Sequence, residues 1–104
     1  MQILFEVTDP RAIIITCSQE QWEEHVLQHK PFMSRYLESV KETLRNPDFI
    51  SQDVLHKKRN CYYSRKFKRA YIKVIVALKS NQKAELITAY IDDGGKKGEE
   101  LLWP

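Results

Sequence analysis

Hydrophobic and polar residues alternate through the second half of the chain, and this pattern predicts a β-rich region. The strongest segment is Tyr71–Leu78, where every second residue is a large aliphatic one. A period of two is typical of a strand that buries one face. Cys61–Phe67 and Glu85–Ile91 lie close to it in sequence, so we expect an antiparallel meander with Tyr71–Leu78 in the centre. The side chains expected to face the core are Ile72, Val74, Val76 and Leu78.

The first half of the chain opens with two short strand patterns and a helix signal. Ile3–Val7 and the β-branched run at residues 12–16 predict strands. Ser18 followed by Gln21 is a capping-box pattern, so we expect a helix to begin there. This helix should end near residue 29, because the residue before Pro31 resists the α region.

A second helix is expected from about residue 32 or 34 to Arg45. Apolar residues recur there at helical spacing: Met33, Tyr36, Leu37, Val40 and Leu44. Asn46-Pro47-Asp48 ends the helix, and we expect Phe49–Ile50 to pack back onto the core.

These elements predict one α+β domain over residues 1–104, with the N-terminal helices packed on one face of a mostly antiparallel sheet of about four strands. A length of 104 residues supports a single core. Residues 91–104, which begin with a glycine-rich stretch at 92–98, are expected to be a flexible tail.

Charge is distributed very unevenly along the chain. Residues 54–84 contain ten of the 17 Lys and Arg residues and none of the 14 Asp and Glu residues. This asymmetry favours a polyanionic partner, and the aromatic residues among the bases suit stacking on nucleic-acid bases. The expected nucleic-acid-binding residues are Lys57, Lys58, Arg59, Lys66, Lys68, Arg69 and Lys73. The alternative is a solvated β-ribbon whose charges protect the sheet edges.

Other function classes have little support in the sequence. No apolar run approaches the length of a membrane span, and the first residues do not resemble a signal peptide, so we expect no membrane partner. Cys17 and Cys61 form neither a metal motif nor a disulfide framework, which favours a reducing cytoplasm. We therefore expect no metal and no cofactor.

Two histidines are candidates for acid–base chemistry. His25 and His29 are four residues apart, so they project from one side of the first helix, at the border of its apolar stripe. A histidine at such a border is suited to proton transfer near neutral pH. The alternatives are structural or surface histidines.

The predicted strands offer groups that would contact a phosphate. Alternation places Tyr63 and Arg65 together on one strand face, and it places Thr88 and Tyr90 together on the last strand. Positioned Arg or Lys donors, here Arg65 and Arg59, stabilise the charge that develops during phosphate-ester cleavage. We expect Ile87, Ala89 and Ile91 to be the core positions of the last strand.

The ordered set of these motifs resembles the small phage and bacterial domains of the barnase–EndoU–colicin–RelE nuclease fold. The residues that carry the resemblance are Ile15-Thr16, Trp22-x-x-His25-Val26-x-x-His29-x-Pro31, Asn46-Pro47-Asp48-x-Ile50, Tyr62-Tyr63-x-Arg65, Ile72-x-Val74-Ile75-Val76 and Ile87-Thr88-Ala89-Tyr90. The resemblance covers about residues 12–91. It implies a helical part on a four-stranded antiparallel sheet and metal-independent RNA cleavage.

The resulting hypothesis is a small metal-independent endoribonuclease, toxin-like or RNA-processing, with RNA as its partner. His25 and His29 would be the acid and base, Arg65 would stabilise the transition state, and the positioning groups would be Tyr63, Thr88 and Tyr90. Two alternatives use the same basic ribbon without catalysis. One is a nucleic-acid-binding module, and the other is a protein-interaction domain that meets an acidic antitoxin or immunity partner.

Overall fold

The structure, a computed structural model, describes residues 2–94 and 98–104. Within these residues the chain forms one seven-stranded sheet with the order β1-β2-β6-β5-β4-β3-β7. The strands are β1 (Ile3–Thr8), β2 (Ile14–Ser18), β3 (Phe49–Gln52), β4 (Arg59–Phe67), β5 (Ala70–Leu78), β6 (Lys83–Asp92) and β7 (Glu100–Trp103). The helical segments are the π-helix η1 (Gln21–Leu27), the 3₁₀ helix η2 (Pro31–Tyr36) and α1 (Leu37–Arg45).

The predicted architecture, N-terminal helices on a sheet of about four strands, is wrong. The sheet of the described residues has seven strands, and the helical layer is short, with nine residues in α1. The two strands missed altogether, β3 and β7, have four residues each, which is too short to show an alternating pattern. They form because β3 has partners on both sides, with β4 and β7 both antiparallel to it.

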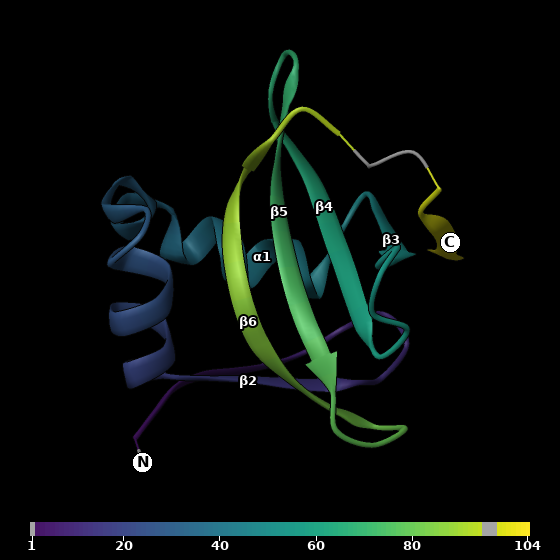
Figure 1. The fold of residues 1–104 in the computed structure, drawn as a ribbon, viewed down its shortest axis with the longest axis horizontal. Coiled ribbons are helices and arrows are strands. Elements are labelled where there is room, and N and C mark those ends of the chain that lie inside the picture. Colours follow the sequence, from purple (N-terminus) through teal and green to yellow (C-terminus); the bar gives the residue numbers. More distant parts are fainter. Residues whose placement is uncertain (1, 95–97) are drawn as a thin grey trace.

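The predicted meander itself is confirmed. β5 lies between β4 and β6 and is antiparallel to both. Ile72, Val74 and Val76 are buried in the main core together with Val40 and Leu44 of α1. Leu78, also expected in the core, packs at its margin. In Figure 1, α1 crosses behind β6, β5 and β4, so one face of these strands is covered by helix.

The predicted first helix begins with the expected contact but continues differently. The Ser18 hydroxyl accepts the Gln21 backbone N–H at 3.0 Å. The Gln21 side chain does not complete the capping box, because it donates to the carbonyl of Ile87 at 2.6 Å. Trp22 and Val26 are buried against the core. η1 therefore packs against β6. The second predicted helix is divided into η2 and α1.

Of the core positions predicted for β6, Ala89 is confirmed and Ile91 packs against the core, but Ile87 needs correction. Leu86 is buried, whereas Ile87 is only partly buried. Ile75 pairs with Thr88 and Val76 pairs with Leu86, so the register shifts by one residue at Ile87. A bulge of this kind changes the phase of the alternation, and the sequence pattern does not reveal it.

A polar network fastens the turn between β1 and β2 to β4. The carboxylate of Asp9 accepts the Tyr62 hydroxyl at 2.5 Å and the Arg11 backbone N–H at 2.8 Å. Arg11 also donates to Asn60 at 2.7 Å and to the Tyr62 hydroxyl at 3.0 Å. Burial and the bond to Asp9 raise the pKa of Tyr62. The network holds Tyr62 on the helix side of β4, so its neighbour Tyr63 points to the opposite face.

The segment predicted as a flexible tail contains regular structure. Ile91 and Asp92 complete β6, and β7 pairs with β3 at the edge of the sheet. Trp103 packs against the core. Gly95, Lys96 and Lys97 of the predicted tail lie outside the described residues.

Candidate functional site

The candidate site lies on the face of the sheet that points away from α1. The register aligns Tyr63 with Lys73 and Lys73 with Tyr90, so one residue from each of β4, β5 and β6 forms a row. The next row joins Arg65 to Tyr71, and a third row joins Ile75 to Thr88. We call this surface the Lys73 face; its polar and charged side chains are Ser51, Tyr63, Arg65, Tyr71, Lys73, Thr88 and Tyr90.

Lys73 is buried at the centre of this face. Its side chain is 1% exposed, and its ammonium group lies 5.1 Å from the ring centre of Tyr63 and 5.8 Å from that of Tyr90. A charged lysine without a partner would be very costly at such a place. The described partner is the carboxylate of Glu99, 3.4 Å away.

The charge of Lys73 is maintained despite its burial. Burial by itself lowers the pKa of the ammonium group, but the neighbouring acidic groups Tyr90, Cys61, Glu99 and Asp92 raise it. The net result is a pKa above the ordinary value for lysine. Lys73 is therefore a buried cation, and its ammonium group can donate charge-assisted hydrogen bonds to an anion.

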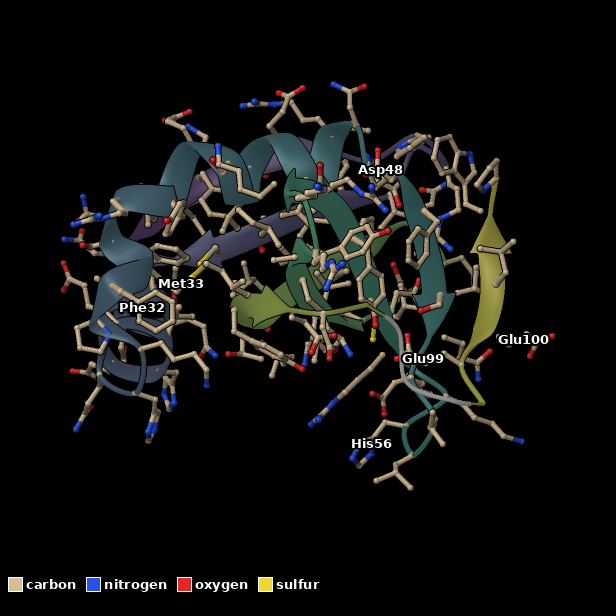
Figure 2. The ribbon with its side chains drawn as sticks, turned by 90° about the horizontal axis from the view of Figure 1, so that it is seen from above. Phe32, Met33, Asp48, His56, Glu99 and Glu100 are labelled. Atoms are coloured by element: carbon tan, nitrogen blue, oxygen red, sulfur yellow. The ribbon has the colours of Figure 1, made fainter. Side chains whose placement is uncertain are left out.

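Glu99 reaches the Lys73 face from the segment that leads into β7. Its carboxylate accepts the Tyr63 hydroxyl at 2.7 and 2.9 Å and also accepts the hydroxyl of Ser51. The Glu99 side chain is 5% exposed. Figure 2 shows Glu99 directed toward the sheet, whereas Glu100 points outward beyond β7.

The two tyrosines beside Lys73 stay protonated to high pH. Burial and then the hydrogen bond to Glu99 raise the pKa of Tyr63. Burial also raises the pKa of Tyr90, although the nearby Lys73 lowers it. Both phenols are thus hydrogen-bond donors near neutral pH, and neither is a general base there.

Arg65 extends the site toward the hairpin between β4 and β5. Its guanidinium donates to the Tyr71 hydroxyl at 3.1 Å, and this bond raises the pKa of Arg65. Asp48, at the predicted stop of the second helix, accepts the backbone N–H of Arg65 at 2.6 Å. Phe49 stacks on Tyr63 with ring centres 4.5 Å apart. Arg65 is therefore a fully charged, solvent-exposed cation on an aromatic platform.

The predicted histidine pair lies on a neighbouring element. His25 and His29 are exposed at η1 and just beyond it, and within the described residues neither forms a hydrogen bond or an ion pair. The chain that follows η1 reaches the Lys73 face, because the Lys30 ammonium lies 5.2 Å from the ring centre of Tyr90. The structure thus places His25 on η1 and His29 just beyond it, beside the site, but records no contact between either histidine and Arg65 or Thr88.

The predicted nucleic-acid-binding residues lie at both ends of β4. Lys57 and Lys58 are exposed in the loop before the strand, where Figure 2 also shows His56, and Arg59 begins the strand. The other exposed bases lie where the β4–β5 hairpin projects in Figure 1: Lys66, Lys68 and Arg69. The Lys73 face lies between these two groups. Lys73 differs from the other predicted binders because it is buried, so it has no free surface for a ligand while Glu99 is in place.

Sequence reasoning missed Ser51, Glu99 and the aromatic neighbours Phe49 and Tyr71 as site residues. Ser51 was missed because β3 was not predicted, and Tyr71 was expected only as one of the aromatic residues suited to base stacking, not as a partner of Arg65. No local signal marks Glu99, because its role depends on a pairing between segments 26 residues apart. The predicted residues Tyr63, Arg65, Thr88 and Tyr90 do share one face.

Comparisons of the chain with models of protein families, with curated proteins and with solved structures found no match. The resemblance to the nuclease fold therefore stays a prediction. No group of three or more His, Cys, Asp and Glu side chains in residues 2–94 and 98–104 is placed to hold a metal ion. Across the same residues, no helix has the length and apolar character needed to cross a membrane.

Proposed function

We propose that the protein is a metal-independent endoribonuclease that binds single-stranded RNA across the Lys73 face. The observation that carries this proposal is the buried lysine between Tyr63 and Tyr90. A buried, charged lysine on a sheet face surrounded by hydroxyl groups is typical of a functional site. Arg65 and Thr88 on the same face supply a second cation and a further hydroxyl.

Each group has a role in the proposed cleavage. The RNA 2′-hydroxyl attacks the adjacent phosphorus, a base takes its proton, and an acid protonates the departing 5′-oxygen, leaving a 2′,3′-cyclic phosphate. His25 and His29 are the proposed base and acid, in an order that we leave open. Arg65 stabilises the charge that develops on the phosphate oxygens. Tyr63, Thr88 and Tyr90 position the phosphate through their hydroxyl groups.

The aromatic and basic surroundings support RNA rather than another anion. Phe49, Tyr63 and Tyr71 form a cluster, with Phe49 and Tyr71 at 5.9 Å and Tyr63 and Tyr71 at 6.1 Å between ring centres. Unpaired bases stack on aromatic rings that reach solvent, which in this cluster are Phe49 and Tyr71, whereas Tyr63 is buried. The exposed lysines and arginines at both ends of β4 would follow the phosphate backbone on either side.

The experiment that tests this proposal incubates the protein with a labelled single-stranded RNA and the DNA of the same sequence, with and without chelator. We expect cleavage of RNA to a 2′,3′-cyclic phosphate, intact DNA, and no effect of chelator. An RNA that remains intact under all conditions refutes the enzymatic proposal.

A second candidate is a module that binds RNA without cutting it. The observation that favours it is the exposure of His25 and His29 without a recorded contact to the Lys73 face. RNA binding without cleavage would support this candidate. Binding of an acidic protein in place of RNA would instead support an antitoxin or immunity partner. The proposed location for each candidate is the cytoplasm, where the buried thiols of Cys17 and Cys61 would remain reduced.

A further inference from the structure

On the Lys73 face, hydrogen-bond donors from three strands form a cradle, and the carboxylate of Glu99 occupies it. Ser51, Tyr63 and Lys73 come from the adjacent strands β3, β4 and β5, and all three donate to Glu99. Such a cradle fits a small oxyanion, because charged and hydroxyl donors converge on two acceptor oxygens. A phosphate group of RNA presents the same kind of acceptor to the same donors.

We propose that Ser51, Tyr63 and Lys73 form a binding site for a phosphate group, and that Glu99 occupies this site when no ligand is bound. Glu99 is then an internal competitor, so it holds the buried cation in a defined position and keeps weakly bound anions out. The RNA part of this inference rests on the proposed function, whereas binding of a free phosphate does not.

The position of Glu99 next to an edge strand favours its release. β7, which follows Glu99, is the last strand of the sheet, and within the described residues its one strand partner is β3. Leu101 and Leu102 of β7 are exposed, and Trp103 is the residue of this strand that packs against the core. Elements with few buried contacts open at lower free energy than the core. Gly98, with φ +94°, adopts a backbone conformation that favours glycine just before Glu99.

Charge gives the second reason to expect a phosphate. Without a ligand, the carboxylate of Glu99 compensates the buried charge of Lys73. A ligand phosphate that replaced Glu99 would keep the charge of Lys73 compensated, so the buried cation would not be left alone. The competing interpretation is that Lys73 and Glu99 form a permanent ion pair whose only role is to hold β7 at the edge of the sheet.

The decisive experiment compares Glu99→Ala with the matched control Glu100→Ala, which removes the same charge from the next residue, on the outward side. Melting temperatures are measured in chloride and in inorganic phosphate at equal ionic strength. We expect phosphate to raise the melting temperature of Glu99→Ala by about 4 °C or more, and that of the wild type and Glu100→Ala by much less. The double variant Lys73→Met/Glu99→Ala should lose this shift. Equal shifts in all four proteins, or a shift that survives Lys73→Met, overturn the inference.

Glu99→Gln provides a safeguard against loss of folding, because its amide oxygen still accepts from Tyr63 and Ser51 while the charge is removed. It should show the same phosphate-dependent shift. In the wild type, phosphate should also change the emission of Trp103, which follows Glu99 in β7, and Trp103→Phe should abolish that change. Unchanged emission together with an unshifted Glu99→Gln refutes the inference.

An RNA arm separates this inference from the proposed function. A short RNA with a 5′-hydroxyl, which carries only internal phosphates, should bind Glu99→Ala about tenfold more tightly than Glu100→Ala. If phosphate stabilises Glu99→Ala but RNA binds no variant, the phosphate site stands and the proposed function fails. If all variants bind and cleave RNA equally and phosphate stabilises none, the proposed function stands and the phosphate site fails.

Discussion

Lys73 and Glu99 form a buried ion pair, 3.4 Å apart, between the central strand of the sheet and the segment that leads to its outermost strand. Their side chains are 1% and 5% exposed, so water screens the pair very little. A buried pair of this kind contributes little relative to apolar residues, but the loss of one partner alone is costly. The pair therefore connects the stability of the protein to the state of its candidate site.

The first prediction concerns this coupling. Lys73→Met should lower the free energy of unfolding by about 3 to 5 kcal/mol, because it leaves the carboxylate of Glu99 buried without a cation. Lys73→Met/Glu99→Gln should be more stable than Lys73→Met alone, because the buried charge is removed as well. Urea denaturation of the wild type, both single variants and the double variant measures the coupling. A double variant less stable than Lys73→Met would show that the two residues are not coupled in this way.

The second prediction concerns alkaline stability. Burial raises the pKa of Cys17 from 9.0 to about 12. A raised pKa means that the folded protein holds the proton more tightly, so the stability it adds is complete below pH 9 and is lost as the pH rises toward 12. The raised pKa values of Tyr62, Tyr63 and Tyr90 act in the same direction, from about pH 10 upward.

Denaturation midpoints measured from pH 7 to 11 check this prediction. The wild type should begin to lose stability near pH 9. Cys17→Ala should be less stable than the wild type at pH 7, but its stability should stay constant up to about pH 10, where ionisation of the tyrosines begins to lower it. Identical pH profiles for the two proteins would contradict the role assigned to Cys17.

The meander could be predicted from the sequence because its signal is local. The alternation in β5 marks both its strand character and its core side, and the antiparallel register then brings Tyr63, Tyr90 and the residue between them into one row. Lys73 was expected to be an exposed binder, because alternation places it opposite the core residues. It is buried because a segment distant in sequence, at Glu99, covers it. Periodicity describes one strand at a time and contains no information on such a cover.

The fold class could not be predicted because the edges of the sheet are made by weak patterns. β3 and β7 have four residues each. Pairing with neighbouring strands, rather than the strand propensity of their own residues, makes them strands. β2 pairs in parallel with β6, so the N-terminal strands are attached to the meander by a pairing between segments that are far apart in the sequence. Local patterns predicted the strand at Ile3–Val7, but they did not identify its partner.

The third prediction concerns the electrostatics of RNA binding. If phosphates contact the bases around β4, the affinity for RNA should fall steeply with salt, because binding releases counterions. Replacing Lys66, Lys68 and Arg69 by Ala should lower the salt slope by up to about three, close to one unit for each lost phosphate contact. Lys41→Ala is a suitable control, because Lys41 lies on α1, on the other side of the sheet, and is paired with Glu38 at 3.1 Å. Fluorescence anisotropy at several salt concentrations measures the slope, and a slope that is the same in all variants would argue against a role for the hairpin.

The fourth prediction separates two arginines that differ in their surroundings. Arg65 is held on the Tyr71 hydroxyl and its backbone is fixed by Asp48, whereas Arg69 is exposed at the hairpin. Arg65→Ala should therefore reduce kcat more than Arg69→Ala, because a positioned cation acts on the transition state. Arg69→Ala should act mainly on RNA affinity. If the two variants reduce kcat to the same extent, Arg65 is only one of several binding residues.

The last prediction concerns the histidines, whose proposed roles require them to reach the Lys73 face from η1. Removal of a positioned acid or base typically lowers the rate by about 10²- to 10⁴-fold. His25→Ala and His29→Ala should each lose activity on this scale while keeping the melting temperature of the wild type, because both side chains are exposed. His56→Ala is the matched control, since His56 is an exposed histidine in the β3–β4 loop (Figure 2). An acid–base pair also predicts a bell-shaped pH profile of kcat/KM that loses one arm in each active-site variant. Wild-type rates in both His25→Ala and His29→Ala would exclude the histidine mechanism, and the acid and base would then have to be sought among the groups around Lys73.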